Sequence, residues 1–273
     1  MSDIAVDITG EELMAITASR LLADHKVVFA GVGMPLLASA VARHRHAPHL
    51  TIVLEGGIIG TTLLPGKLPI STNEMRAAYG AQMLTDITDI FLYAQRGYFD
   101  YGFLGAAQVD MYGNINTSVI GTMERPRVRL PGSGGANDII SLCNEVLIVT
   151  QHEPRRFVER VDFITSPGYL SGGDSRARAG LVTGGLGAVV TDLALLDFEP
   201  ASRRMRLCAL QPGVSVGQVR AQTGFELLLS DEITELTPPS PEEVAIYREL
   251  RDGPAAGQAA GVAEPDRVAA RPA

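Results

Sequence analysis

The chain has only two cysteines and no long apolar run, and each scarcity excludes a class of protein. Cys143 and Cys208 form neither a CxxC pair nor a disulfide framework, which fits a reducing compartment. No stretch approaches the ~18 to 20 uninterrupted apolar residues of a membrane span. The acidic N-terminus, MSDIAVDITGEELM, also lacks the apolar run of a signal peptide. We therefore expect a cytoplasmic protein that does not enter a membrane.

Basic residues are in the minority, because 23 Lys and Arg stand against 31 Asp and Glu, a net charge of −8. This balance argues against a nucleic-acid-binding surface, which normally needs a basic patch. It does not exclude an anionic substrate, since a site can be locally positive on an acidic protein.

Glycine clusters follow several apolar runs, but two of them fail as nucleotide-binding motifs. Gly31-Val32-Gly33-Met34-Pro35 is followed by Leu36, where GxGxxG needs its third glycine. Gly66-Lys67 is followed by Leu68, where a phosphate-binding loop needs the Ser or Thr that holds magnesium. Neither a dinucleotide fold nor a nucleotide triphosphatase is indicated.

Apolar and polar segments alternate as in an α/β fold. Helices are expected from the capping box Thr9–Glu12 to Leu21 and over residues 36–45, 138–144, 215–223 and 241–251. Strands are expected over residues 26–31, 50–54, 90–94, 103–109, 145–150, 188–198 and 205–210, with a hairpin around 199–203. This alternation predicts an open, mostly parallel sheet with flanking helices. We expect one domain over residues 1–252 and a disordered tail over 253–273, which has few bulky apolar residues.

Glu55 is the first candidate catalytic residue. It ends the apolar run LTIVL of residues 50–54 and is followed by Gly56 and Gly57. Ligands of open α/β sheets bind beyond the carboxyl ends of the strands, and glycines allow close approach of the backbone. A carboxylate there is placed to attack a substrate or to take a proton. A glutamate that caps a helix or forms a salt bridge is the alternative.

A second candidate site is the run Gly132-Ser133-Gly134-Gly135-Ala136-Asn137, just before a predicted helix. Small residues leave backbone N–H groups exposed, and such N–H groups bind anions or carbonyl oxygens. The alternative is a loop that needs small residues only for packing.

His44, His46 and His49 form a third cluster. We interpret it as the basic end of a helix and expect no metal site.

Together with further segments, these residues resemble the family I CoA-transferases, and within them the β subunit of glutaconate CoA-transferase. The resemblance covers most of residues 10–240. It rests on Gly31–Leu36, Leu54–Gly57, Gly105–Asn116 (GAAQVDMYGNIN), Gly132–Asn137, Gln151–Phe157 (QHEPRRF) and Ile164–Gly168 (ITSPG).

The resemblance implies a role for each candidate. Glu55 would attack an acyl-CoA thioester and carry CoA as a glutamyl thioester in ping-pong catalysis. Gly56, Gly57 and the run from Gly132 to Asn137 would bind the substrate and its CoA portion. CoA would enter as a substrate, with no other cofactor. The family pattern has serine or asparagine after the glutamate, whereas this chain has Gly56, so the acceptor acid stays open.

The resemblance also implies that the chain is half of an enzyme, which pairs with an α subunit, as α2β2, around a shared site. Two other functions stay open: a subunit of a CoA-thioester hydrolase or decarboxylase, and a non-catalytic subunit on the same fold. A glutamate at position 55 favours transfer, because the hydrolytic relatives lack it.

Overall fold

The structure is a computed structural model that describes residues 8–254. Its helices are α1 (Gly10–Arg20), α2 (Met34–Arg45), α3 (Ile87–Gln95), α4 (Ala136–Leu142), α5 (Ser175–Arg178), α6 (Val216–Ala221) and α7 (Pro241–Asp252), with a 3-10 turn η1 (Met75–Ala78). Its strands are β1 (Val27–Phe29), β2 (Thr51–Leu54), β3 (Ile58–Ile59), β4 (Met83–Leu84), β5 (Tyr101–Leu104), β6 (Gln108–Val109), β7 (Ile115–Asn116), β8 (Val119–Gly121), β9 (Pro126–Arg129), β10 (Glu145–Val149), β11 (Leu186–Val190), β12 (Ala194–Phe198), β13 (Met205–Leu210) and β14 (Leu228–Glu235).

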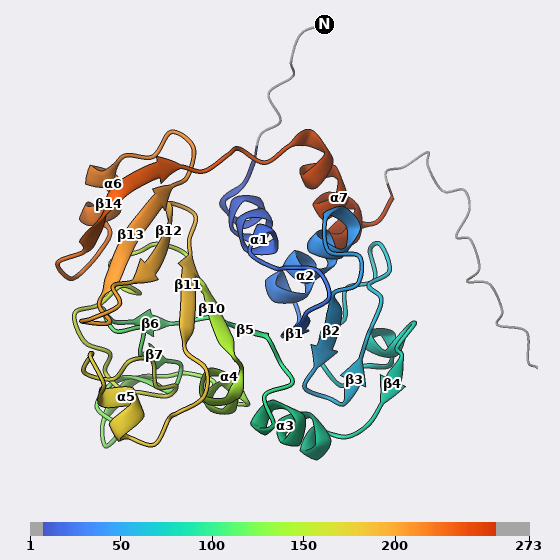
Figure 1. The fold of residues 1–273 in the computed structure, drawn as a ribbon, viewed down its shortest axis with the longest axis horizontal. Coiled ribbons are helices and arrows are strands. Elements are labelled where there is room, and N and C mark those ends of the chain that lie inside the picture. Colours follow the sequence, from blue (N-terminus) through green and yellow to red (C-terminus); the bar gives the residue numbers. More distant parts are fainter. Residues whose placement is uncertain (1–7, 255–273) are drawn as a thin grey trace, which may run out of the picture.

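Ten strands form one sheet in the order β14-β13-β12-β11-β10-β5-β1-β2-β3-β4 (Figure 1). The central strands β11, β10, β5, β1 and β2 run parallel. The neighbours β12 and β13 on one side and β3 and β4 on the other pair antiparallel. The predicted fold, an open and mostly parallel sheet with flanking helices, is confirmed.

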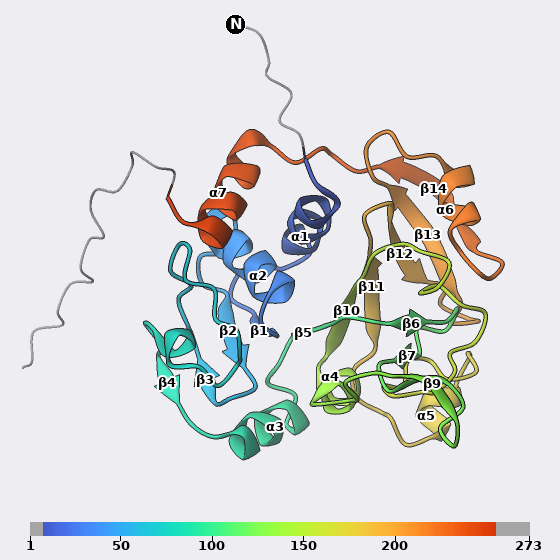
Figure 2. The same cartoon turned by 180° about the vertical axis from the view of Figure 1, so that it is seen from behind.

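The two faces of the sheet bury two apolar clusters, because successive strand residues point to opposite faces. In β2, Ile52 and Leu54 belong to the cluster beneath α1, α2 and α7, whereas Val53 belongs to the cluster beneath α3 and α4. Figure 2 shows the same arrangement from behind, with α1, α2 and α7 together on one side of β1 and β2 and with α3 and α4 on the other side. This arrangement leaves the carboxyl ends of the central strands between the helices.

Two ion pairs bind the first helix to the last. Arg20 contacts Glu243 at 2.7 Å, and Arg248 contacts Glu12 at 2.6 Å. Glu12 also closes the predicted capping box with Thr9. The hydrogen bond from Arg248 lowers the pKa of the buried Glu12 carboxyl to about 2. Residues from the two ends of the described chain therefore fold as one unit.

Three strand predictions were wrong in detail. Residues 90–94 lie inside α3, because Asp86 caps a helix there by accepting from the N–H of Asp89. Residues 188–198 form two antiparallel strands, β11 and β12, since Thr191 Oγ1 accepts from the N–H of Ala194 and turns the chain. Residues 103–109 are likewise divided between β5 and β6. The predicted tail lies, except for Gly253 and Pro254, outside the described residues.

Candidate functional site

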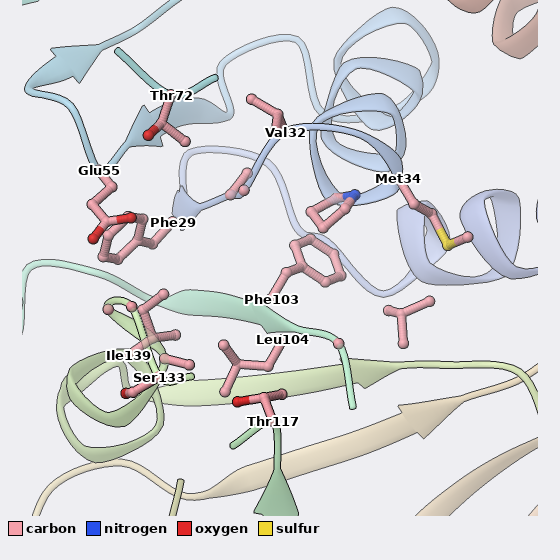
Figure 3. Close-up of a pocket in the computed structure, with 18 of the residues that line it drawn as sticks. Phe29, Val32, Met34, Glu55, Thr72, Phe103, Leu104, Thr117, Ser133 and Ile139 are labelled. Carbon is pink, nitrogen blue, oxygen red and sulfur yellow. The ribbon is translucent and has the colours of Figure 1, made fainter. Parts of the chain in front are cut away.

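The carboxyl ends of the parallel strands β1, β5 and β10 open onto a cavity of about 500 Å³, and Glu55 enters it from the end of β2 (Figure 3). Its wall is mainly apolar, and it consists of Phe29, Ala30, Gly31, Val32, Met34, Pro35, Glu55, Thr72, Phe103, Leu104, Gly105, Thr117, Gly132, Ser133, Gly134, Gly135, Ala136, Ile139 and Val149. Of the described residues, 8–254, Glu55 is the one with an ionisable side chain in this wall. An apolar cavity with a single charged group at strand ends is the usual form of a ligand site in this fold class.

The Glu55 side chain projects from the tight turn between β2 and β3. The turn closes with a hydrogen bond from the N–H of Gly57 to the carbonyl of Leu54 at 3.1 Å. Glu55 is half-buried, and within residues 8–254 no group donates a hydrogen bond to its carboxylate or forms an ion pair with it. It is therefore neither a capping residue nor part of a salt bridge.

Gly56 and Gly57 shape the turn instead of lining the cavity. A Cβ on Gly56 would overlap Asn73 Oδ1 and the carbonyl of Thr72. A Cβ on Gly57, which has φ +94°, would overlap the carbonyl of Thr85. Gly56 thus lets the segment around Thr72 and Asn73 fold against the Glu55 turn, and Gly57 does the same for Thr85. Thr72 reaches the cavity wall (Figure 3).

The glycine loop lies directly against Glu55. A Cβ built on Gly135 would stand 2.8 Å from Glu55 Oε1 and 2.7 Å from Phe91 Cζ, so only a hydrogen fits there. Gly134 (φ +49°) faces open space. Among residues 8–254 no acceptor takes the N–H groups of Ser133, Gly134 or Gly135. The loop therefore presents free backbone donors beside a free carboxylate.

Thr117 holds this loop in place, and the sequence interpretation missed it. Its hydroxyl donates to the carbonyl of Gly132 at 2.8 Å, and its own carbonyl accepts from the Gly132 N–H at 2.8 Å. The Thr117 N–H donates to Thr165 Oγ1, from the segment ITSPG. The remaining predicted loop residue, Asn137, is turned out of the cavity wall and donates its side-chain amide to the carbonyl of Thr165 at 3.0 Å.

The segment GAAQVDMYGNIN forms a buried polar network behind the cavity. Asn116 donates to Gln108, and Asn114 donates to Asp110, with burial raising the pKa of the Asp110 carboxyl. The last residue of the segment, Asn116, precedes Thr117. The sequence signal that could have indicated this network is the run of Asp110, Asn114 and Asn116 within one short segment.

His152, from QHEPRRF, is also a structural residue. Its ring stacks on Phe157 with 4.0 Å between ring centroids and bonds Thr191 and Thr223 through its two nitrogens. Burial lowers the pKa of His152 to about 4, so the ring is neutral at pH 7.

The histidines of the predicted cluster point to different partners. His44 bonds the carbonyl of Ala40, His46 bonds the carbonyl of Leu22, and His49 pairs with Asp24 at 2.9 Å. Asp24, His49 and His25 do meet, but the two rings stack in nearly parallel planes, 6° apart. Their in-plane lone pairs are therefore not aimed at one ion.

The spacing GxSxG also occurs, at residues 213–217 (GVSVG), but Ser215 is not presented as a nucleophile. It is the N-cap of α6, and its hydroxyl donates to Gln218 Oε1 at 2.9 Å. In the part of the chain that the structure describes, no helix combines the length and apolar character that crossing a membrane requires.

Comparison with known proteins gives consistent matches. The family model described as Coenzyme A transferase matches residues 11–222. The chain is 40% identical to the B subunit of 3-oxoadipate CoA-transferase from Pseudomonas knackmussii, over 92% of this chain and 96% of that one. It is 35% identical to the B subunit of glutaconate CoA-transferase from Acidaminococcus fermentans, over 89% and 92% of the two chains.

Solved structures agree with these sequence matches. The crystal structure of glutaconate coenzyme A-transferase from Acidaminococcus fermentans superposes with a TM-score of 0.84 at 32% identity, covering 90% of this chain and 95% of that one. The decarboxylase AibA/AibB superposes with a TM-score of 0.75 at 27% identity, covering 89% and 95%.

Proposed function

From the premise that this chain belongs to the coenzyme A transferase family and is similar to its B subunits, we propose a role for Glu55. Glu55 carries CoA covalently between an acyl-CoA and a free carboxylic acid. The observation that supports this most is the Glu55 carboxylate itself. Within residues 8–254 it is the one ionisable group in the cavity wall and has no hydrogen-bond or ion-pair partner, so a carboxylate oxygen is free to attack.

The reaction would proceed in four balanced displacements. A Glu55 oxygen attacks the thioester carbonyl, the C–S bond breaks, and CoA leaves as the thiolate, which leaves an acyl-glutamyl anhydride. The thiolate then attacks the Glu55 carbonyl carbon and expels the first acid as its carboxylate. The acceptor carboxylate reverses both displacements, so no water or net proton is consumed.

The glycine loop would stabilise the charge that develops in these displacements. Each tetrahedral intermediate places negative charge on the former carbonyl oxygen, and preorganised N–H donors stabilise such an oxyanion. The free N–H groups of Ser133, Gly134 and Gly135 are donors in the cavity wall, in the loop whose Gly135 lies against Glu55. The apolar side chains of Phe103 and Leu104 would exclude water, which otherwise hydrolyses an anhydride.

The cavity would be completed by an A subunit, as the names of the relatives indicate. The most exposed large apolar side chains near the cavity are Ile70, Met75 and Leu84, which are 83%, 80% and 61% exposed. They belong to the segment that includes Thr72 of the cavity wall.

Helix α3 (ITDIFLYAQ) continues this surface. It is apolar around most of its circumference, yet Ile87 and Leu92 are exposed, and Phe91 lies against Gly135. A helix that is apolar all round is normally buried. We therefore assign the surface formed by residues 70–92 as the contact with the A subunit, and the stoichiometry α2β2 is part of the same proposal.

The names of the two B-subunit relatives both specify dicarboxylic acids, 3-oxoadipate and glutaconate. We propose dicarboxylic acids as the acceptors to test first. Among residues 8–254 no cationic side chain lines the cavity, and we propose that the A subunit supplies the positive charge that binds the second carboxylate.

The decisive experiment uses this chain co-expressed with its A subunit and assayed for CoA transfer from an acyl-CoA to a free acid. Glu55→Gln preserves the size of the side chain and removes the attacking oxygen anion, so turnover should fall by roughly a thousandfold or more. Glu159→Gln, a change at an exposed carboxylate away from the cavity, should leave turnover unchanged.

Trapping tests the covalent step separately. Borohydride or hydroxylamine added after acyl-CoA should modify one peptide, the one that contains Glu55, as read by mass spectrometry. A modified peptide in the A subunit, or normal exchange by Glu55→Gln, would refute the mechanism. Release of CoA without any requirement for an acceptor acid would instead indicate a hydrolase.

Assembly is tested by co-purification. Leu84→Lys places a charge in the proposed contact surface and should abolish recovery of the A subunit. Val182→Lys is the matched control, because Val182 is 81% exposed in a loop outside that surface. Loss of assembly in the Val182 variant but not in the Leu84 variant would show that the surface was assigned wrongly.

A further inference from the structure

The hairpin formed by β8 and β9 is an unusual basic feature on an acidic chain. Residues 122–129 (TMERPRVR) are all exposed, and they include Arg125, Arg127 and Arg129 but a single acid, Glu124. No carboxylate within residues 8–254 forms a salt bridge with any of the three arginines. Within the hairpin, Arg129 Nη1 lies 3.1 Å from the sulfur of Met123, and the Arg125 N–H donates to Thr122 Oγ1 at 3.2 Å, which leaves the Arg125 guanidinium unengaged. Three guanidinium groups are therefore available to an anionic ligand.

The base of this hairpin is the wall of the Glu55 cavity. β9 leads directly into the glycine loop, and the hairpin ladder continues through hydrogen bonds from Leu130 N–H to the carbonyl of Ser118 and from Gly132 N–H to the carbonyl of Thr117. Thr117 and Gly132 both line the cavity. Arg129 is three residues from Gly132, so their Cα atoms lie within about 10 Å of each other.

The arginines extend outward from the cavity along this ribbon. Arg127 and Arg129 are two residues apart on β9 and so leave the same face of the strand. Arg125 follows at the turn, and the three Cα atoms span on the order of 13 Å of extended chain. An elongated ligand with its reactive end at Glu55 would place its other end along this row.

We propose that Arg125, Arg127 and Arg129 bind the phosphate groups of coenzyme A, an inference that rests on the proposed CoA transfer at Glu55. Coenzyme A has its thiol at one end of a long pantetheine arm and its pyrophosphate and ribose phosphate at the other. Guanidinium groups bind phosphate oxygens through paired charge-assisted hydrogen bonds. The glycine loop and the arginine row thus form two ends of one CoA site, with the pantetheine arm lying between them.

The test compares ligands with and without phosphates on the assembled complex. Isothermal titration measures binding of CoA and of pantetheine, which has the same thiol arm and no phosphate. Arg127→Ala/Arg129→Ala should weaken CoA binding by about tenfold or more and leave pantetheine binding unchanged, because the charge-assisted hydrogen bonds that are lost are made to phosphate oxygens alone. Turnover with an acyl-CoA and with the matching acyl-pantetheine should show the same selective loss in kcat/KM.

A matched pair of charge reversals controls for the overall field of the protein. Arg127→Glu should weaken CoA binding further, whereas Arg220→Glu, at an exposed arginine on α6, should not. The loss caused by Arg127→Glu should also shrink at high salt.

Equal weakening of CoA and pantetheine, or unchanged CoA binding in the double alanine variant, would overturn the proposal. Loss of the A subunit from the Arg127 variants would instead assign the hairpin to the subunit contact, which also overturns it. Because titration needs no turnover, a complex that binds CoA through these arginines but transfers nothing would refute only the proposed reaction at Glu55.

Discussion

Gly135→Ala isolates the contact between the glycine loop and the catalytic carboxylate. Gly135 has φ −79° and ψ 1°, a conformation that alanine adopts readily, so the backbone has no reason to change. The added methyl carbon, however, would lie 2.8 Å from Glu55 Oε1 and 2.7 Å from Phe91 Cζ. Ordinary contacts begin near 3.4 Å, and the flexible end of Glu55 is the atom freest to move.

The displacement predicts a loss of activity without a loss of stability. A shift of the attacking group by the order of 1 Å can cost about a hundredfold in rate, because the reacting atoms must be aligned. Replacing glycine where the backbone tolerates a side chain stabilises by about 0.4–1 kcal/mol through the unfolded chain, which offsets part of the new contact. The melting temperature should therefore hardly change while kcat for CoA transfer falls about a hundredfold.

Gly134→Ala is the matched control in the same loop. The added Cβ would enter open space, but φ +49° is costly for alanine. Gly134→Ala should therefore lose about 1 kcal/mol of stability, and its kcat should fall much less than that of Gly135→Ala. Both variants are assayed as the complex with the A subunit, with thermal unfolding measured alongside kcat and KM. The reasoning fails if Gly135→Ala keeps normal kcat, or if the control loses as much activity with a normal fold.

Three further outcomes follow from the described contacts. Because burial lowers the pKa of His152 from 6.5 to about 4, the stability that the neutral ring contributes is complete above pH 6.5 and is lost as the pH falls toward 4. The free energy of unfolding in urea should therefore decline by up to about 3 kcal/mol over that range. His152→Gln should show a smaller decline. Arg248→Ala leaves the buried Glu12 carboxylate without its guanidinium and should cost about 3 kcal/mol in the same assay, whereas Arg248→Lys should recover part of it. Gly56→Ser restores a residue type of the family pattern, but its side chain would overlap Asn73. We therefore expect a lower melting temperature and an altered KM for the acid. An unchanged melting temperature and KM would contradict the packing described at this turn.

Strand and helix identity followed from local signals wherever burial was strong and caps were present. The run TIVL of β2 and the strand β10 are buried and were predicted from apolar runs alone. The capping box at Thr9 and Glu12 began α1 where expected. Ile90 to Ala94 misled the prediction because an apolar run of that length suits a strand or a helix equally, and the Asp86 cap decides for the helix.

By itself, the sequence determined which residues could belong to a site. A lone carboxylate after a buried strand and a run of small residues before a helix are local chemical facts, and parallel strands oblige their carboxyl ends to meet at one edge of the sheet. Only the tertiary structure decided how these residues meet. Gly135 touches Glu55, Asn137 turns away toward Thr165, and Thr117 holds the loop, because these contacts join segments separated by many residues whose packing no local pattern records.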